Sequence, residues 1–420
     1  MNVTITPAPL NGTIAAIPSK SHLHRLLICA ALGDTELCLP CPKLSQDIEA
    51  TVRCLNALGA KVKYQSNELS VIPIASSDQN VTLDCGESGS LYRFLVPVIG
   101  ALNKNATFKL SGKLPERPMD ALWNTLEAHG AVITGKGTAT PIVSGILTSG
   151  RYEIPGDISS QFISGLLFAL PLLSGDSEIV ISGQTQSVGY IQMTLDALTA
   201  FSIKAIPTPT GFSIPGNQTY HAINTPIPEG DWSNSAFWLC AAACSGEITV
   251  TGLNPNSGQG DKAICDILRQ FGASVSQIDN AVTVRKGNLH GITIDAADIP
   301  DLVPALAVVA AAADGTTTIQ NISRLRLKES DRVATVCGLI NALGGNASSN
   351  ENTITIIGNG TLTGGTYDAF QDHRIVMAAA IASTICKNPV TVTNAQAVDK
   401  SYPEFFSDFS RLNGICRERS

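Results

Sequence analysis

Positively charged side chains recur along this chain near the polar starts of apolar segments. Eight such residues share this kind of position: Lys20, Arg25, Arg93, Arg117, Lys328, Arg332, Arg374 and Lys400. The start of an α-helix presents unpaired N–H groups and a partial positive charge, which bind phosphate and carboxylate. Arginine adds a planar fork of donors that matches the same anions. These residues predict a site for two multiply charged anions, provided that the fold brings the helix starts together.

Each polar start also has an ordinary structural explanation. A Ser or Asp before an apolar run usually only caps a helix, and a single arginine lies on the surface or lines a core about as often as it lies in a site. However, charged residues make up only 15% of the chain, and these eight occur at a similar phase of one pattern. The recurrence, rather than any one residue, favours the anion site.

That pattern occurs six times. A polar loop precedes an apolar helix, a turn and a short strand; a second loop, an amphipathic helix and further strands follow. The polar loops are Pro18-Ser-Lys-Ser21, Glu87-Ser-Gly-Ser90, Asp157-Ile-Ser-Ser-Gln161, Asp231-Trp-Ser-Asn-Ser235, Asp298-Ile-Pro-Asp301 and Gln371-Asp-His-Arg374. The amphipathic helices are expected to end at Gly59, Gly130, Ser202, Gly272, Gly344 and Gly414, at spacings of 71, 72, 70, 72 and 70 residues. Such a fixed period indicates a repeated supersecondary unit, here of βαβαββ type.

The predicted fold class is therefore α/β, with three repeats in each of two domains. A chain of 420 residues is longer than a single core usually supports. The first helix of each repeat is apolar on nearly all sides and should be buried. The Pro-rich stretch from Ile206 to Asp231 is the expected hinge between the two sets of three repeats.

Composition excludes several classes of protein. The net charge of -7, without a compensating Lys/Arg block, argues against nucleic-acid binding. We expect no membrane span, because no apolar run reaches 18 residues. We also expect no signal peptide, and therefore a cytoplasmic protein. Eleven scattered cysteines are typical of reduced thiols. We interpret Cys38-Leu-Pro-Cys41 as incidental, and we expect no metal site, because no second pair or His cluster completes one.

Seven sequence blocks resemble the signature blocks of the 5-enolpyruvylshikimate-3-phosphate synthase family, in that family's order. They are Ser19-Lys-Ser-His-Leu-His-Arg-Leu-Leu27, Glu116-Arg-Pro-Met119, Ser159-Ser-Gln-Phe162, Asp298-Ile-Pro-Asp301, Leu327-Lys-Glu-Ser-Asp-Arg332, Asp372-His-Arg374 and Lys400-Ser-Tyr-Pro403. The resemblance covers about residues 5 to 410. It implies the family's inverse α/β fold, with one domain over residues 18–228, a second over residues 1–17 and 229–420, and the active site in the cleft between them.

The resemblance also implies an activity. The expected reaction transfers the enolpyruvyl (carboxyvinyl) group of phosphoenolpyruvate to the 5-hydroxyl of shikimate 3-phosphate and releases phosphate, a step of aromatic amino acid biosynthesis. The enzyme is expected to need no cofactor, to bind neither nucleic acid nor membrane, and to be a monomer.

The site residues implied by the resemblance fall into two binding sets and a catalytic pair. Lys20, Arg117, Arg332, Arg374 and Lys400 match positions that contact phosphoenolpyruvate, and Gly89 lies in the divergent second block that we also assign to substrate binding. Ser21, Arg25, Ser159, Ser160, Gln161, Ser187, Tyr190, Asp301 and Lys328 match positions that hold shikimate 3-phosphate. Asp301 and Glu329 match the catalytic carboxylates.

The chemistry needs a proton delivered to the methylene carbon of the enol and a proton taken from the attacking hydroxyl, so an acid and a base must lie close together. We assign Asp301 as the base and Glu329 as the acid, with Lys20 or Lys400 aiding the departure of phosphate. The structural alternative for Glu329 is a salt bridge to Lys328 or Arg332 in its own block.

The chain departs from the family's better-known pattern at Glu87, where Asn is usual, Ser90, where Thr is usual, Phe94, where Pro is common, and Arg324, where a smaller polar residue is usual. These differences indicate a divergent branch.

Three alternatives stay open. The related transferase for UDP-N-acetylglucosamine carries a reactive Cys before an Arg-Pro stretch, whereas Gly112-Lys-Leu-Pro-Glu116 precedes Arg117 here. An RNA 3′-phosphate cyclase would use ATP and a nucleotidylated His, for which His373 is the only candidate. A non-catalytic binding module should have lost the set of Asp301, Glu329 and Lys20.

Overall fold

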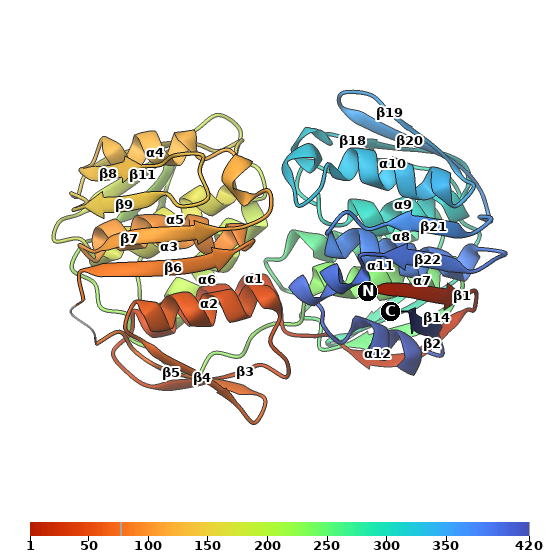
Figure 1. Cartoon of the computed structure of the whole chain (residues 1–420), viewed down its shortest axis with the longest axis horizontal. Coiled ribbons are helices and arrows are strands. Elements are labelled where there is room, and N and C mark those ends of the chain that lie inside the picture. Colours follow the sequence, from red (N-terminus) through yellow and green to blue (C-terminus); the bar gives the residue numbers. More distant parts are fainter. Residues whose placement is uncertain (76–77, 420) are drawn as a thin grey trace. The chain divides into compact units, whose positions relative to one another are not determined.

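The computed structural model describes residues 1–75 and 78–419 and divides the chain into two compact units (Figure 1). The inserted unit runs from Pro18 to Pro228. The discontinuous unit comprises Met1–Ile17 and the chain from Glu229 onwards. Each unit has a hydrophobic core of its own. Among the described residues, no helix is both long and apolar enough to cross a membrane.

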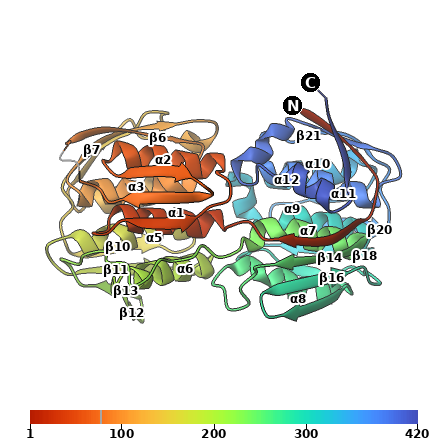
Figure 2. The same ribbon diagram turned by 90° about the horizontal axis from the view of Figure 1, so that it is seen from below.

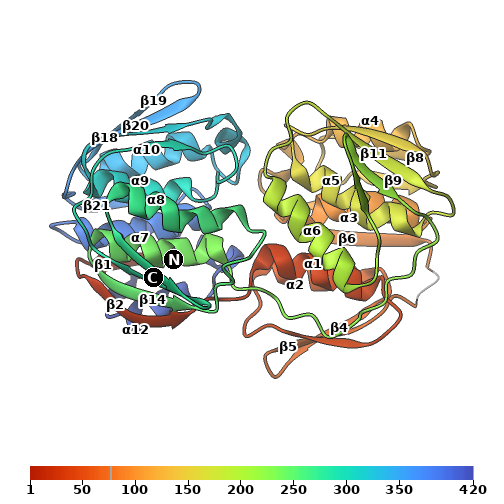
Figure 3. The same ribbon diagram turned by 180° about the vertical axis from the view of Figure 1, so that it is seen from behind.

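The inserted unit contains three small sheets, one for each repeat. In order of pairing, the strands of the first sheet are β3 (Leu37–Pro40), β5 (Glu68–Ile72) and β4 (Lys61–Gln65). Those of the second are β6 (Asn80–Gly86), β7 (Asn105–Leu110), β9 (Ile142–Gly145) and β8 (Ala131–Thr134). Those of the third are β10 (Arg151–Pro155), β11 (Ser177–Ser182), β13 (Gly211–Ile214) and β12 (Ile206–Thr208). The helices are α1 (Lys20–Ala31), α2 (Gln46–Ala57), α3 (Gly89–Ala101), α4 (Asp120–Glu127), α5 (Ser160–Ala169) and α6 (Val188–Ala200), with 3-10 turns η1 (Leu114–Glu116) and η2 (Leu170–Leu172). Figure 3 shows α6 beside α1 and α5, which it contacts.

The discontinuous unit repeats the arrangement. In order of pairing, the strands of its first sheet are β2 (Leu10–Ala15), β14 (Gly246–Thr251), β16 (Ala281–Arg285) and β15 (Ser274–Ile278). Those of the second are β17 (Thr293–Asp295), β18 (Asp314–Gln320), β20 (Thr353–Asn359) and β19 (Asn346–Ser349). Those of the third are β21 (Gly365–Asp368), β22 (Val390–Thr393), β1 (Asn2–Thr6) and β23 (Ile415–Arg419). The helices are α7 (Trp232–Cys244), α8 (Ile264–Phe271), α9 (Val303–Ala312), α10 (Arg332–Ala342), α11 (His373–Ala382) and α12 (Phe405–Arg411). Four 3-10 turns join them: η3 (Gly260–Ala263), η4 (Ser323–Leu327), η5 (Ser383–Ile385) and η6 (Ala395–Lys400).

The first helix of each repeat is buried, as its apolar composition predicts. All thirteen residues of α7 and all ten of α11 are buried. Helices α7, α9 and α11 contact one another, and Figure 2 shows them next to each other in the discontinuous unit. This contact brings the starts of three helices of one unit into one region.

The N-terminal strands complete two sheets of the distant C-terminal repeats. β2 pairs in parallel with β14, and β1 lies between β22 and β23, antiparallel to both. β1 alternates buried Val3 and Ile5 with exposed Asn2 and Thr6, as a strand with one face on a core should. Among the described residues, the sheet of the first repeat has three strands, whereas each of the other five sheets has four.

The Pro-rich stretch differs from the hinge that the sequence predicted. Its first part, Ile206 to Ile214, forms the hairpin of β12 and β13 in the third repeat, and the chain passes between the units at Pro228 and Glu229. Pro207 is compatible with a strand because β12 is the edge strand of its sheet.

An asparagine near the helix end joins helix and strand in two repeats. Asn341 in α10 accepts a hydrogen bond from the backbone N–H of Ala347 at 2.8 Å and donates to the carbonyl of the same residue at 2.8 Å. Asn56 in α2 makes the same pair of bonds with Val62. Both asparagines begin the sequence Asn-Ala-Leu-Gly, so this motif fixes where the chain turns from helix to strand.

Asn341→Ala should lower the free energy of unfolding by about 1–3 kcal/mol, because the partly buried backbone groups of Ala347 lose both partners. Equilibrium denaturation with urea measures the change. Asn124→Ala, at an exposed position of α4, is the control and should stay within about 0.5 kcal/mol of the wild type. Equal stability of the Asn341→Ala variant and the wild type would show that the helix-to-strand bonds are replaced by water without loss.

Candidate active site

A buried guanidinium, that of Arg332, joins three carboxylates of the discontinuous unit. Its Nε donates to Asp372 Oδ2 at 2.9 Å, its Nη1 to Asp301 Oδ1 at 2.7 Å and its Nη2 to Glu329 Oε2 at 2.7 Å. The residue is 1% exposed. Burial alone lowers the pKa of Arg332, but the three carboxylates outweigh this effect and raise it. The guanidinium therefore stays charged and fixes three side chains at once.

The three carboxylates reach Arg332 because helix starts converge. Asp301 lies just before α9, Arg332 is the first residue of α10, and Asp372 is the N-cap of α11. Helices α9, α10 and α11 contact one another. Asp372 also caps its own helix, since its Oδ1 accepts from the backbone N–H of Arg374 at 3.0 Å.

Asp301 is surrounded by cations. Its Oδ1 lies 3.4 Å from Lys328 Nζ and 2.7 Å from Arg332 Nη1, and its Oδ2 lies 3.1 Å from Arg374 Nη2. Burial would raise the pKa of Asp301, but Arg374, Lys328 and Arg332 outweigh it and hold the pKa well below its usual range. Asp301 is thus an ionised carboxylate, able to accept a proton.

Glu329 lies between two cations. Arg332 donates to its Oε2, and Lys400 Nζ lies 3.8 Å from its Oε1. The salt bridge to Arg332 that the sequence offered as the structural alternative is therefore present. The side chain of Glu329 is 14% exposed and that of Lys400 6%, so this pair is less exposed than Asp301 and Lys328, at 20% and 24%.

The cluster as a whole is positive. Its cations are Lys328, Arg332, Arg374 and Lys400, and its carboxylates are Asp301, Glu329 and Asp372. Arg324 adds to the positive field, because it lowers the pKa of Lys328 after the larger effect of burial. On a chain whose net charge is -7, a positive cluster is a local feature that favours binding of anions.

A second group of predicted residues lies in the inserted unit around Arg25. This arginine is 2% exposed and donates from Nε to Thr194 Oγ1 at 2.8 Å, from Nη1 to the carbonyl of Ser21 at 2.6 Å and from Nη2 to the carbonyl of Tyr190 at 3.0 Å. Burial lowers its pKa to about 10. Arg25 thus ties the start of α1 to the start of α6.

The start of α5 carries the predicted Ser159, Ser160 and Gln161. The hydroxyl of Ser159 accepts from the backbone N–H of Gln161 at 3.3 Å. Gln161 Oε1 accepts from Arg93 Nη1 at 2.7 Å, and its Nε2 donates to Ser90 Oγ at 2.7 Å. The divergent Ser90 therefore has a defined role, which is to orient Gln161.

Gly89 lies against Arg117. A Cβ added at Gly89 would be 3.0 Å from Arg117 Nη1 and 3.5 Å from Arg93 Nη1. The lack of a side chain lets two guanidinium groups approach the start of α3.

Lys20, also in this unit, donates from Nζ to Asp47 Oδ2 at 2.6 Å. Asp47 belongs to α2, whereas Lys20 begins α1, so the lysine is held by a neighbouring helix.

Ser187 has an unusual backbone. It is the N-cap of α6 with a φ of 55°, in the left-handed region that residues other than glycine rarely adopt. Such conformations persist only where the surrounding structure enforces them, and they gather at functional sites. Ser187 is 4% exposed, and Tyr190 follows it in the first turn of α6.

Three residues of these clusters were not given a binding or catalytic role of their own from the sequence: Asp47, Arg93 and Asp372. The sequence nevertheless pointed to two of them, because Asp372 belongs to one of the seven sequence blocks and Arg93 is one of the eight recurring cations. Asp47 had no signal of its own in the sequence, because its role depends on Lys20 in another helix.

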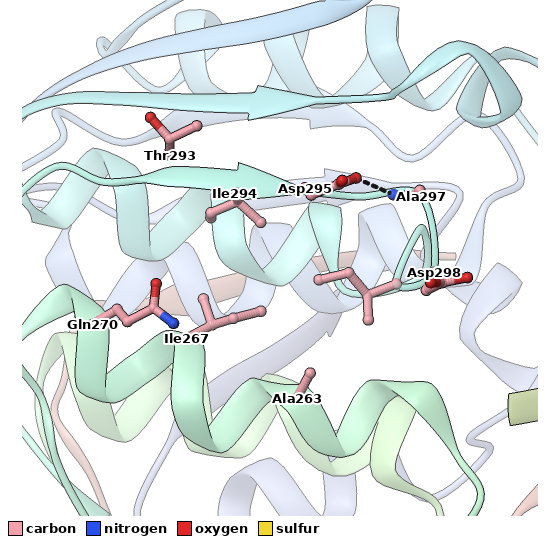
Figure 4. Close-up of a pocket in the computed structure, with 9 residues that line it drawn as sticks. Ala263, Ile267, Gln270, Thr293, Ile294, Asp295, Ala297 and Asp298 are labelled. Atoms are coloured by element: carbon pink, nitrogen blue, oxygen red, sulfur yellow. Dashed lines mark hydrogen bonds between the residues drawn. The ribbon is translucent and has the colours of Figure 1, made fainter. Parts of the chain in front are cut away.

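A cavity of about 340 Å³ lies elsewhere in the discontinuous unit, between α8 and the edge strand β17 (Figure 4). Ala263, Ile267 and Gln270 line it from α8 and the turn before it; Thr293, Ile294 and Asp295 line it from β17, and Ala297, Asp298 and Ile299 follow β17. None of these nine residues is Lys or Arg. The cavity is therefore not built for a phosphorylated anion, and the ion cluster is the better candidate site.

Comparisons with known proteins agree with the fold and with the sequence blocks. Residues 5–409 match the family model of EPSP synthase (3-phosphoshikimate 1-carboxyvinyltransferase). A 3-phosphoshikimate 1-carboxyvinyltransferase from Clostridium acetobutylicum is 42% identical, over 100% of this chain and 99% of that protein. One from Clostridium botulinum is 40% identical, over 99% of this chain and 98% of that protein.

Solved structures show the same fold at lower identity. EPSP synthase from Acinetobacter baumannii aligns with a TM-score of 0.83 at 23% identity, over 99% of this chain and 100% of that one. The enolpyruvyl transferase NikO from Streptomyces tendae aligns with a TM-score of 0.80 at 16% identity, over 99% of this chain and 98% of that one. The α/β fold class predicted from the sequence is confirmed, and so is the resemblance stated there. This chain belongs to the EPSP synthase (3-phosphoshikimate 1-carboxyvinyltransferase) family.

Proposed function

We propose that this protein transfers the carboxyvinyl group of phosphoenolpyruvate to the 5-hydroxyl of shikimate 3-phosphate and releases phosphate. It is then a transferase of the shikimate pathway, in aromatic amino acid biosynthesis. One observation carries the proposal beyond family membership: an ionised carboxylate and a second carboxylate, Asp301 and Glu329, lie together in a positive cluster bridged by Arg332. That arrangement supplies an acid–base pair and anion-binding groups in one place.

Asp301 acts as the base. Its three cationic neighbours keep it ionised, so it can take the proton from the attacking hydroxyl as the oxygen bonds to the enol carbon. The same cations hold the side chain still, and a base must lie within hydrogen-bond reach of the proton that it removes.

Glu329 acts as the acid toward the methylene carbon. Neighbouring cations favour the ionised form of a carboxylate, whereas an acid must carry a proton. We infer that the substrates, by placing their own negative charge beside Arg332 and Lys400, release Glu329 to take up a proton. Lys400, or Lys20 from the inserted unit, then aids the departure of phosphate.

The proposed binding residues fall into two sets, one for each substrate. In this proposal Lys20, Arg117, Arg332, Arg374 and Lys400 bind phosphoenolpyruvate. The residues proposed to bind shikimate 3-phosphate are Ser21, Arg25, Ser159, Ser160, Gln161, Ser187, Tyr190, Asp301 and Lys328. The hydrogen bonds of Arg25 and Gln161 support their assignment, because a side chain already fixed by its neighbours loses little freedom on binding.

We also propose that the protein works in the cytoplasm as a monomer. All eleven cysteines are free thiols and nine of them are buried, which is the pattern of a protein kept in a reducing compartment.

The direct test of the function is the release of phosphate from phosphoenolpyruvate with each of two acceptors. Shikimate 3-phosphate should support turnover, and UDP-N-acetylglucosamine should not, because no Cys precedes Arg117 in the stretch from Gly112 to Glu116. Turnover with the nucleotide sugar alone would reject the proposal in favour of the related transferase.

Glu329→Gln and Asp301→Asn should both lower kcat, by about 10²–10⁴-fold for the loss of a general acid or base. They should differ in binding. Glu329→Gln should leave the affinity for shikimate 3-phosphate within a few fold, whereas Asp301→Asn should weaken it, since Asp301 is proposed to contact the hydroxyl. Calorimetric titration beside the phosphate assay separates the two effects.

The control is Glu351→Gln, at an exposed turn of the same unit, which should behave as the wild type. If Glu329→Gln turns over at the wild-type rate, Glu329 is only a salt-bridge residue, and the acid has to be sought at Lys20 or Lys400.

A further inference from the structure

Asp261 is a buried carboxyl group for which the reaction described above has no use. It lies in η3, before α8, and is 1% exposed. Its Oδ2 accepts a hydrogen bond from Ser233 Oγ, while its Oδ1, also buried, has no hydrogen-bond partner among the described residues. An ionised carboxylate has about four acceptor sites to satisfy, and burying a charge with so few partners is costly. The protonated form needs fewer partners, so the geometry favours it.

Capping of α7 does not require a charge on Asp261. The first N–H groups of that helix already have acceptors: the backbone N–H of Trp232 donates to Gln259 Oε1 at 3.0 Å, and that of Asn234 donates to Asp231 Oδ1 at 2.7 Å. Only the hydroxyl of Ser233 reaches Asp261. The carboxyl group of Asp261 therefore lies beside the start of α7, but the helix does not need it as a negatively charged cap.

The turn that carries Asp261 packs against the loop that carries Asp301. A Cβ added at Gly260 would be 3.1 Å from the carbonyl oxygen of Asp298, three residues before Asp301. The charged and polar groups that act on Asp261 come from the loop before α9 (Asp301), from α11 (Arg374) and from the start of α7 (Asp231 and Ser233). Burial, then Asp301 and more weakly Asp231, raise the pKa of Asp261. Arg374 and the hydrogen bond from Ser233 lower it, and the result is a pKa of about 7.

We propose that Asp261 is a positioning residue that is protonated in the working enzyme and so leaves the guanidinium of Arg374 to Asp301. Arg374 donates from Nη1 to the carbonyl of Asp301 at 3.3 Å and from Nη2 to its Oδ2 at 3.1 Å. An ionised Asp261 would attract the same guanidinium and compete with Asp301 for it. The part of the proposal that concerns substrate rests on the proposed function, in which Arg374 binds phosphoenolpyruvate.

Protonation of Asp261 has a signature in stability that does not depend on activity. Between the ordinary pKa of an aspartate, 3.8, and its folded value of about 7, the native state binds one proton more than the unfolded state. Stability contributed by this group therefore falls as the pH rises through that window. Asp261→Asn keeps the shape and cannot ionise, so it does not suffer this loss.

The experiment compares the melting temperatures of the full-length wild type and Asp261→Asn at intervals from about pH 5 to about pH 8. The melting temperature of the variant relative to that of the wild type should rise with pH up to about pH 7 and level off above it. Asp266→Asn, an exposed carboxylate of α8 that pairs with Arg269, controls for the removal of a carboxylate as such. The proposal would be overturned if the melting temperature of Asp261→Asn lies below that of the wild type by an amount that is constant or grows with pH, because Asp261 would then be ionised in the folded protein.

Infrared spectroscopy of the wild type alone keeps the proposal testable if Asp261→Asn fails to fold. Protein with carbon-13 in its aspartate carboxyl groups should show the C=O stretching band of a protonated carboxylic acid at about pH 6, weakening through about pH 7. Absence of that band at the lower pH would overturn the proposal.

Kinetics test the link to Arg374. At about pH 8, where the wild type is largely ionised at Asp261, KM for phosphoenolpyruvate should be several-fold lower in Asp261→Asn than in the wild type, with KM for shikimate 3-phosphate unchanged. Equal KM values for phosphoenolpyruvate would overturn the effect on Arg374. A protein that shows the trend in melting temperature but releases no phosphate with either acceptor would instead refute the proposed function.

Discussion

The guanidinium of Arg332 is the interaction on which the discontinuous unit's site depends. It is 1% exposed and bridges carboxylates that belong to three helix starts. Breaking a buried ion pair by removing one partner is strongly destabilising, because the other charge is left uncompensated. Any shift of α9, α10 or α11 relative to the others would separate charges in this way, so the network fixes the geometry of Asp301 and Glu329, the proposed base and acid, together.

Two aspartates of the same unit show how partners decide protonation. Asp301 has three cations within 3.4 Å and a pKa well below the usual range. Asp261 is 1% exposed, whereas the side chain of Asp301 is 20% exposed. Asp261 accepts one hydrogen bond from Ser233 and has a pKa of about 7. Burial acts on both in the same direction, and the number of charged neighbours separates them. Two aspartates of one unit can thus differ widely in pKa because their neighbours differ.

Much of the fold could be predicted from the sequence because its signals are local. The apolar helices, their polar starts and the period of about 71 residues each depend on neighbouring residues, and they agree with the elements observed. The use of β1 and β2 in the sheets of the last and fourth repeats could not be predicted from such signals, because Val3 pairs with Val392 and Leu10 with Gly246, far away in the sequence. The predicted hinge was too broad for a related reason, since Pro207, in β12 (Ile206–Thr208), is also compatible with an edge strand.

For the site, residues within recognisable blocks could be named, whereas the contacts that hold them could not. Lys20 and Gln161 were predicted, but Asp47, which holds the lysine, was not. Arg93 was named as one of the cations, but its hydrogen bond to the amide of Gln161 was not predicted. Asp261 is the extreme case, since its properties arise from Ser233 on one side and from Asp301 and Arg374 on the other.

The protonation state of Asp301 is the point at which the network and the proposed chemistry meet. Carbon-13 NMR of protein labelled at the aspartate carboxyl groups, with the resonance of Asp301 identified by its loss in Asp301→Asn, measures that state directly. The resonance should keep its ionised position as the pH is lowered through the ordinary titration range of an aspartate, until the protein unfolds in acid. A titration at or above that ordinary range would contradict both the cationic cage around Asp301 and its assignment as the base.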